Sequence, residues 1–407
     1  MLRYILPLAA TVVIAACSDN DAGVGPANPP TPPADPVVQT AETNAPVYWN
    51  AVARELVGTY RFNALQAIRG YSIVSLAQYN AAIAAEKGRV AGPRPPEDGK
   101  GIRPSIHAAI SAASVVVLTY LHPSEASALE ARMTQYLHGD IRPSERSKNV
   151  ELGEEIGREI GAQVVERAKS DGFFAPWTGT VPTGAGKWVP NGTPVGAMVG
   201  QAKPYFMTSG KQFRPVPPPA FGSAEFTDAL AEIRKISDTR TEEQKQIAIF
   251  WNLPAGTHQP PGYWNEEAAK LALRYRLGER EAAHTLALMN MVSYDAIVAS
   301  HEAKYHYWLV RPSQADAGIV LAIGLPNFPS YPSNHATISA AMARVLGDRF
   351  PSESQRLDDL ADQAALSRIY GGIHYRFDGE VGLSLGRTIA SWGLAHDVNG
   401  HQPFDLR

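Results

Sequence analysis

Three short motifs between residues 304 and 378 decide the interpretation of this chain: Lys304-x6-Arg311-Pro312, Pro332-Ser333-Asn334-His335 and Ser367-Arg368-x5-His374-x3-Asp378. Together they supply three cations, a hydroxyl group, the start of a helix and two imidazoles, one with a carboxylate four residues away. A multiply charged oxyanion that leaves water needs its charge matched and its oxygens hydrogen-bonded. The three motifs therefore predict a site for a tetrahedral oxyanion.

The first motif lies at the end of a predicted helix that runs from Glu281 to Val310. A separation of seven residues would place Lys304 and Arg311 on one face, two turns apart, in line with a stripe of apolar and small residues. Cations that point toward a core are costly unless a counter-charge is present, and this favours a bound anion. The alternative is that both side chains snorkel to solvent from a fraying helix end.

The second motif precedes a predicted helix over residues 335–346, with Ser333 as the expected N-cap. The unpaired N–H groups and the dipole of a helix start favour anions. His335 lies in the first turn, where a positive charge is disfavoured, so we expect its pKa to respond to its surroundings. An ordinary helix cap beside a surface histidine is the alternative interpretation.

The third motif closes one predicted helix, Leu357–Ile369, and opens another, Ile373–His396, with His374 and Asp378 one turn apart. A carboxylate bonded to one imidazole nitrogen fixes the tautomer and leaves the other nitrogen free as a nucleophile or ligand. A routine surface His–Asp pair has the same spacing. The presence of all three motifs in this order favours a functional site.

The motifs resemble the signature of the superfamily that unites type-2 phosphatidic acid phosphatases, bacterial acid phosphatases and vanadium-dependent haloperoxidases. The superfamily pattern is K-x6-RP, PSGH and SR-x5-H-x3-D, and this chain departs from it only at Asn334, where glycine is usual. Flanking segments, such as residues 328–332 and 374–378, resemble the bacterial vanadium haloperoxidase branch. Because asparagine tolerates a left-handed backbone almost as glycine does, we expect the Asn334 N–H still to face the anion. Its side-chain amide would then donate to the anion or crowd it.

The resemblance implies a role for each residue of the motifs. His374 would coordinate the vanadium of a bound vanadate, His335 would be the acid–base group for hydrogen peroxide, and Asp378 would orient His374. The vanadate oxygens would be held by Lys304, Arg311, Ser333, Arg368 and a backbone N–H near Asn334. Bound vanadate would activate peroxide as a Lewis acid, and a halide would be oxidised.

Two alternatives to the haloperoxidase stay open. In a phosphatase of the same superfamily, these residues would bind a phosphate ester, His374 would form a phosphohistidine intermediate, and His335 would protonate the leaving alcohol. In a lipoprotein scaffold, the fold would be kept and the reaction lost, although the intact histidines argue against this.

The remaining sequence predicts an all-α fold of packed helix bundles in one catalytic domain, residues 46–407. Helices are expected over Tyr48–Val57, Ala64–Glu86, Ile102–Leu121, Ser124–Leu137, Ser144–Ser170, Ala224–Ile236, Glu242–Asn252 and Asn265–Leu277. Residues 173–222 are too rich in proline, glycine and aromatic residues for a long helix, so we expect an ordered loop that covers the helices. No alternating strand pattern is present.

The N-terminus predicts export and a lipid anchor. Residues 1–17 combine an apolar run with Ile14-Ala15-Ala16-Cys17, which resembles a bacterial lipobox, and Cys17 is the only cysteine of the chain. Residues 18–45 form a proline-rich tether. We therefore expect a membrane-anchored lipoprotein of the bacterial envelope that faces the periplasm or exterior, with simple secretion as the alternative. The net charge of -3 gives no electrostatic basis for binding nucleic acid.

Overall fold

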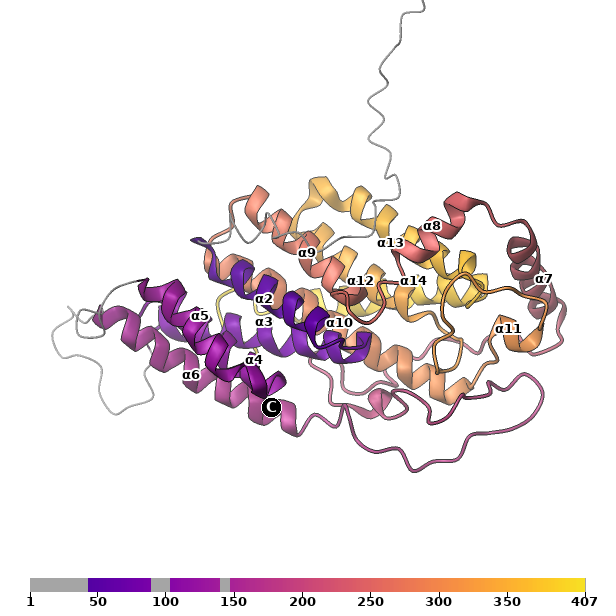
Figure 1. Ribbon diagram of the computed structural model, residues 1–407, viewed down its shortest axis with the longest axis horizontal. Helices are drawn as coiled ribbons and strands as arrows, with labels where there is room; N and C mark the ends of the chain where they lie inside the picture. The colour runs from indigo at the N-terminus through magenta and orange to yellow at the C-terminus, as the bar shows by residue number, and fades with distance from the viewer. Residues whose placement is uncertain (1–42, 89–102, 140–146, 407) are drawn as a thin grey trace, which may run out of the picture.

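The computed structural model describes residues 43–88, 103–139 and 147–406 (Figure 1). Within these ranges the chain forms helices and loops with two isolated bridges and no strand, which confirms the predicted all-α fold. The predicted signal peptide, Cys17 and nearly all of the tether lie outside the described residues. No helix in the described ranges has the length and apolar character needed to cross a membrane.

The N-terminal helices form one bundle, coloured indigo to magenta in Figure 1. Its members are α2 (Ala45–Thr59), α3 (Ala64–Glu86), α4 (Ile106–Leu121), α5 (Ala126–His138) and α6 (Lys148–Lys169). Helix α6 approaches α4 closely because glycines face it: a Cβ atom at Gly157 would lie 2.2 Å from the Ala109 carbonyl oxygen. Helix α2 begins at Ala45, so the last residue of the predicted tether is helical.

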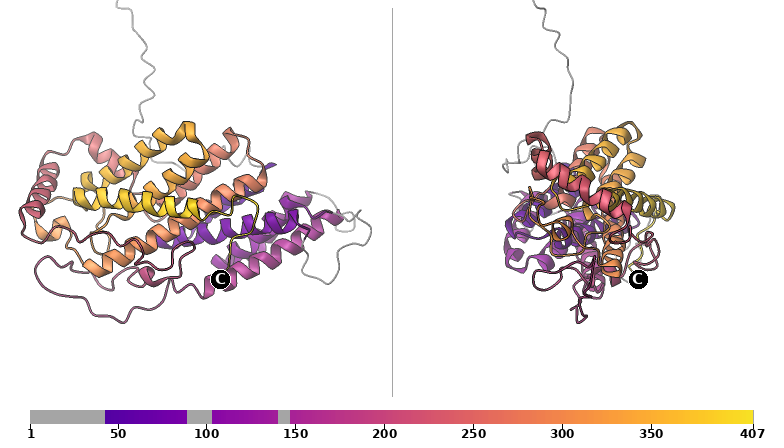
Figure 2. Two further views of the ribbon diagram at one scale, coloured as in Figure 1. Left: turned by 180° about the vertical axis from the view of Figure 1, so that it is seen from behind. Right: turned by 90° about the vertical axis from the view of Figure 1, so that its right-hand side faces the viewer.

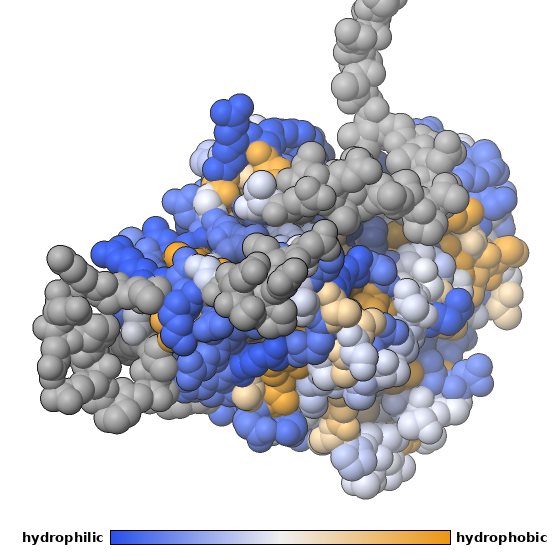
Figure 3. Space-filling model, turned by 60° about the vertical axis from the view of Figure 1, so that its left-hand side comes forward, coloured by the Kyte–Doolittle hydropathy of each residue, from blue (hydrophilic) through white to orange (hydrophobic). Residues whose placement is uncertain are grey.

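The C-terminal helices form a second group around the long helix α10 (Glu279–Tyr307), which packs against both α3 and α12 (Figures 1 and 2). This group contains α9 (Gln259–Arg274), α12 (Asn334–Arg349), α13 (Ser354–Tyr370) and α14 (Arg376–Ala395), with α7 (Ala224–Thr239), α8 (Glu242–Phe250) and α11 (Pro312–Ala315) toward one end. On the face shown in Figure 3, hydrophilic residues dominate and hydrophobic residues occur in small groups between them.

Residues 173–222 form the ordered loop that the sequence predicts, with only a short 3-10 helix at Val199–Gln201. Both oxygens of the buried Asp295 carboxylate on α10 accept backbone N–H groups of this loop, from Tyr205, Phe206 and Met207, at 2.7–3.0 Å. These bonds fix the loop against the helix that carries Lys304.

Two glycines of α14 bring this helix against the start of α12. A Cβ atom at Gly382 would lie 2.8 Å from the Ser333 carbonyl oxygen, and one at Gly386 would lie 2.2 Å from that of Thr337. Because these glycines lack side chains, the two helices meet at the position of the second and third motifs.

Several predicted helix boundaries are wrong. Helix α10 ends at Tyr307, Trp308 adopts a left-handed conformation (φ 56°), and Arg311 is the N-cap of α11. Lys304 and Arg311 therefore do not lie on one helix, and the shared helix face predicted from their spacing of seven residues is wrong. Helix α14 begins at Arg376, so His374 lies in the turn before it. Helix α9 begins at Gln259 instead of Asn265, because the first turn of a helix tolerates the two prolines that follow Gln259.

Candidate active site

His374 and Asp378 form a buried pair at the start of α14. The Nδ1 atom of His374 lies 2.8 Å from Oδ2 of Asp378, and the same oxygen accepts from Ser330 Oγ at 2.5 Å and from the Tyr375 N–H at 3.1 Å. Because the carboxylate oxygen is an acceptor, Nδ1 carries the hydrogen and Nε2 carries the lone pair. Burial raises the pKa of Asp378 to about 6, and burial together with the charge of Arg311 lowers the pKa of His374 well below its ordinary value.

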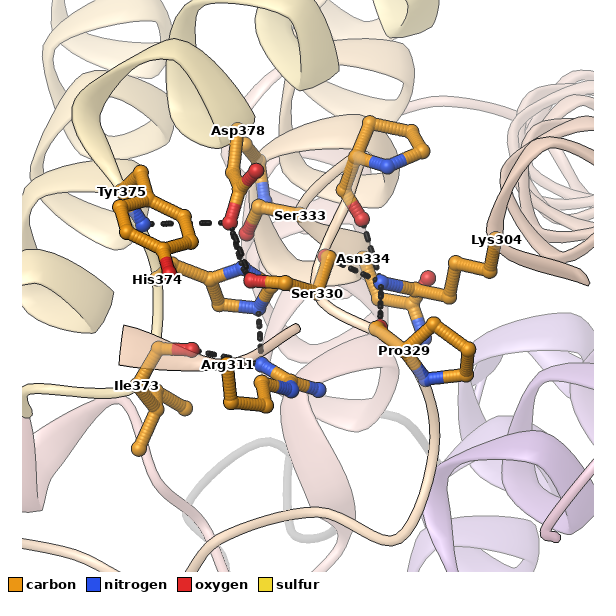
Figure 4. A network of polar contacts seen from close by, with 12 residues as sticks. Lys304, Arg311, Pro329, Ser330, Ser333, Asn334, Ile373, His374, Tyr375 and Asp378 are labelled. Carbon is orange, nitrogen blue, oxygen red and sulfur yellow. Dashed lines mark hydrogen bonds and ion pairs between the residues drawn. The ribbon is translucent and has the colours of Figure 1, made fainter. Parts of the chain in front are cut away.

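Arg311 reaches the His374 lone pair from the opposite side of the ring (Figure 4). Its Nη1 atom lies 3.0 Å from His374 Nε2 and donates to the Ile373 carbonyl at 2.7 Å, while Nε donates to the Phe328 carbonyl at 3.1 Å. Its Nη2 atom is buried and has no hydrogen-bond partner among the described residues. A buried guanidinium nitrogen without an acceptor is costly, so this atom identifies a position where an anion's oxygen would be stabilised.

Lys304 lies in a cage of backbone carbonyls that precede α12. Its Nζ atom donates to the carbonyls of Pro329, Ser330 and Pro332 at 2.9, 2.7 and 2.5 Å. These three bonds occupy the three hydrogens of the ammonium group. In this arrangement Lys304 supplies positive charge and holds the loop, and its predicted bond to the anion's oxygens stays a prediction.

Arg368 and His335 complete the group of residues predicted from the motifs. Arg368 is buried and donates to Ser367 Oγ at 2.9 Å and to the Ala248 carbonyl at 3.0 Å. Burial and then the charge of Arg311 lower its pKa to about 9. His335 Nε2 donates to the Trp251 carbonyl at 3.0 Å. Burial and then the charge of Arg368 lower the pKa of His335 well below its usual value. The acid–base role of His335 stays a prediction.

Ser333 is the N-cap of α12, as predicted, and accepts the Ala336 N–H at 3.5 Å. The backbone N–H groups of Asn334 and His335 have no acceptor among the described residues. They belong to the first turn of a helix that lies within the cluster of cations. Such N–H groups provide donors to an anion without adding flexible side chains.

The expected conformation of Asn334 is wrong. Asn334 is the first residue of α12 and does not have a positive φ, so no left-handed backbone has to be tolerated there. Its side chain bonds to α10 instead: Oδ1 accepts from Ser300 Oγ at 2.7 Å, and Nδ2 lies 3.1 Å from His301 Nε2. These partners, more than thirty residues away in the chain, could not be inferred from the local motif.

The charge and the hydrogen-bond donors of the site can be compared with those that vanadate or phosphate requires. Three buried cations, Lys304, Arg311 and Arg368, face one buried carboxylate, Asp378, so the side chains carry a net positive charge. The donors available among the described residues include the Arg311 Nη2 atom, the Ser333 hydroxyl hydrogen and the first-turn N–H groups of α12. Charge and donors both fit an oxyanion with several negative charges.

Two further residues of the site were not singled out from the sequence. Ser330 joins Asp378 to the Lys304 cage, because its hydroxyl donates to the carboxylate and its carbonyl accepts from the lysine. The ring centroid of Phe328 lies 5.1 Å from Lys304 Nζ and 5.2 Å from the Arg311 guanidinium. Both lie in the flanking segment 328–332, and its resemblance to the haloperoxidase branch was the available signal.

Comparisons with known proteins found similarity to vanadium-dependent peroxidases and to an acid phosphatase. A family model described as the VCPO second helical-bundle domain matches residues 349–399. The chain is 39% identical over 95 residues to a vanadium-dependent bromoperoxidase of Ascophyllum nodosum, covering 16% of this chain and 17% of that protein. It is 29% identical over 185 residues to a non-specific acid phosphatase of Providencia stuartii, covering 44% of this chain and 70% of that protein.

Solved structures match over a larger part of the chain. A bacterial vanadium-dependent iodoperoxidase aligns with a TM-score of 0.74 and 21% identity, covering 88% of this chain and 97% of that one. The apo form of a bacterial vanadium-dependent chloroperoxidase aligns with a TM-score of 0.70 and 15% identity, covering 82% and 94%. The chain therefore has the all-α fold of the bacterial vanadium haloperoxidases, and parts of its sequence are similar to a bromoperoxidase and to an acid phosphatase. The three motifs resemble the superfamily signature in order and spacing, and Asn334 is the position at which this chain departs from it.

Proposed function

We propose that this protein is a vanadate-dependent haloperoxidase that oxidises a halide with hydrogen peroxide. The observation that carries the proposal is the burial of the anion-binding side chains: Lys304, Arg311, Arg368 and His374 are each at most 2% exposed. A site enclosed to this degree favours a small resident oxyanion and small co-substrates over a bulky phosphate ester.

In this proposal the residues of the site hold vanadate and control protons. His374 would bind vanadium through Nε2, the nitrogen that Asp378 leaves unprotonated. Arg311, Ser333, Arg368 and the first-turn N–H groups of α12 would hold the oxygens, with Lys304 contributing charge. Bound vanadate would supply Lewis acidity toward peroxide. His335 would exchange a proton at Nδ1, because its Nε2–H is bonded to the Trp251 carbonyl.

The second candidate is a phosphatase, favoured by the match to an acid phosphatase over 70% of that protein's length. The same donors would bind the phosphate of a monoester. The His374 Nε2 lone pair would attack phosphorus, and His335 would protonate the leaving alcohol. Vanadate and phosphate have nearly the same shape and charge, so both candidates need the same site.

Parallel assays of the purified protein distinguish the candidates. Bromide-dependent consumption of hydrogen peroxide and hydrolysis of an aryl phosphate are measured with and without added orthovanadate. A haloperoxidase consumes peroxide only with vanadate, whereas a phosphatase hydrolyses the ester and is inhibited by vanadate. A scaffold does neither, and this result would contradict both candidates.

We also propose that Cys17 carries lipid and anchors the protein in the bacterial envelope. The lipobox-like segment Ile14–Cys17, the apolar run before it and the proline-rich tether support this proposal. Cys17→Ser should move the protein from the membrane fraction to the soluble fraction without detergent. Unchanged partition into membranes would contradict it.

A further inference from the structure

A buried polar network on α10 contacts the start of α12 and has no part in the proposed chemistry. Ser300 Oγ donates to Asn334 Oδ1 at 2.7 Å, Asn334 Nδ2 lies 3.1 Å from His301 Nε2, and His301 Nδ1 lies 2.9 Å from the Gly196 carbonyl. Ser300 and His301 are fully buried, and Asn334 is 8% exposed. The network therefore links the covering loop, α10 and the helix start that faces the anion site.

The acceptors determine the direction of every hydrogen bond in this network. The Gly196 carbonyl can only accept, so His301 Nδ1 carries the hydrogen and Nε2 of the neutral ring accepts from the Asn334 amide. The Asn334 oxygen accepts from the serine hydroxyl. Both ends of the amide are thereby held, and the side chain cannot flip without losing both bonds.

Gly196 lets the covering loop take part in this network. It has a φ of +73°, and a Cβ atom there would lie 2.7 Å from His301 Cε1. Only a residue without a side chain lets the loop carbonyl approach the ring so closely. The imidazole is therefore fixed by the loop on one side and by Asn334 on the other.

Asn334 connects this network to the candidate anion site, because it is the first residue of α12. Asn334 lies between the N-cap Ser333 and His335, and its own N–H and that of His335 are first-turn donors with no acceptor in the described part of the chain. Four residues after Ser300 on the same helix, Lys304 holds the carbonyls of residues 329, 330 and 332, just before α12. Helix α10 thus holds both the first residue of α12 and the segment just before it.

We infer that His301 and Ser300 are positioning residues that fix the first-turn N–H groups of α12 through the Asn334 amide. The inference rests on the proposed oxyanion site but not on whether its reaction is halide oxidation or phosphate hydrolysis. Neither residue is among those that would hold the anion's oxygens. Replacing a residue that orients a ligand-binding group typically weakens binding by about 10- to 100-fold.

Two substitutions of His301 distinguish a positioning role from a packing role. Each replaces the ring with an amide that occupies the place of only one ring nitrogen. In His301→Gln the amide reaches the place of Nε2 and keeps the contact to Asn334. In His301→Asn the amide reaches only the place of Nδ1 and keeps the contact to the Gly196 carbonyl. Both variants remove the ring, so a role in packing alone predicts equal effects.

The test is titration of each purified variant with orthovanadate and, separately, with inorganic phosphate, alongside its melting temperature. We expect His301→Asn to weaken binding of both anions by about tenfold or more and His301→Gln by less than about threefold. In an Asn334→Gly background, His301→Asn should add no further loss, since the amide that it positions is gone. Ser300→Ala should behave like His301→Asn.

Two results would overturn the inference. One is an equal loss of anion affinity in His301→Gln and His301→Asn. The other is that adding His301→Asn to the Asn334→Gly variant lowers anion affinity as much as it does in the natural protein. A natural protein that binds neither anion would instead disprove the oxyanion site itself. That failure appears before any variant is compared, so the two hypotheses fail in distinguishable ways.

Discussion

The Nδ1 atom of His374 lies 2.8 Å from Oδ2 of Asp378, and this contact determines which nitrogen of a buried imidazole carries the lone pair. The lone pair on Nε2 faces Arg311, whose Nη1 is 3.0 Å away. The ring is therefore held between a carboxylate and a cation. Any ligand that binds His374 through Nε2 enters a region of positive charge.

Replacing Asp378 with asparagine tests the tautomer. Asp378→Asn keeps the shape but removes the charge that fixes the hydrogen on Nδ1, so the ring can place its hydrogen on Nε2. We expect orthovanadate affinity to fall by about 10- to 100-fold in equilibrium titrations. Asp397→Asn is the matched control, because Asp397 forms a similar buried pair with His284 at 2.7 Å outside the site. Equal affinities in the two variants would contradict this role for Asp378.

Replacing Arg311 with lysine tests the unpartnered guanidinium nitrogen. A lysine has one nitrogen and cannot bond to the Phe328 and Ile373 carbonyls and to an anion at the same time. We expect Arg311→Lys to weaken phosphate and orthovanadate binding by about 10-fold or more, measured by calorimetry. Arg376→Lys is the control, since Arg376 is partly exposed and pairs with Glu232. Binding unchanged in Arg311→Lys would place the anion elsewhere.

Adding a methyl group between α12 and α14 should disturb the site without changing any polar residue. In Gly382→Ala the new Cβ atom meets the Ser333 carbonyl at 2.8 Å, whereas in Gly379→Ala the nearest atom is 3.8 Å away. We expect Gly382→Ala to lower the free energy of unfolding by about 1–3 kcal/mol and to weaken anion binding. Gly379→Ala should be neutral or stabilising, because alanine favours helix. Similar effects of both substitutions would show that the close approach is unimportant.

A histidine outside the site predicts part of the pH dependence of stability. His122 stacks on Phe62 at 4.7 Å, and burial lowers its pKa to about 4. An unfolded histidine has a pKa of about 6.5, so between these values the unfolded chain binds the extra proton and stability falls as pH falls.

His122→Phe should remove this contribution. Between pH 6 and pH 4.5 the free energy of unfolding should then fall less steeply, by up to about 1.4 kcal/mol per pH unit. Burial raises the pKa values of Asp295 and Asp378 to about 6, so these two carboxyl groups increase the free energy of unfolding as pH falls. The difference between natural protein and variant in denaturant titrations is therefore the quantity to measure. If the free energy of unfolding changes with pH in the same way in both proteins, the prediction is contradicted.

The motifs predicted which side chains lie close together better than how those side chains are arranged. The order of the three clusters indicated His335, His374, Arg311 and Arg368, because the signature records which side chains are present. The helix boundaries near Arg311 and His374 were wrong, since local periodicity does not show that Trp308 turns left-handed or that α14 starts after His374.

Contacts between distant segments were the least predictable feature. The partners of Asn334 are on α10, and Asp378 is bonded by Ser330, 48 residues earlier in the chain. Such pairs depend on how α10, α12 and α14 pack, which in turn depends on close approaches at glycines such as Gly382. A single sequence contains these residues without indicating which of them meet.

The vanadium content of the protein after incubation with orthovanadate and extensive dialysis shows whether His374 holds vanadate. We predict that the natural protein retains a stoichiometric amount of vanadium, measured by mass spectrometry, and that His374→Ala retains none, because the variant lacks the Nε2 ligand. Retention of vanadium by His374→Ala, or its absence from the natural protein, would contradict the proposed vanadate site.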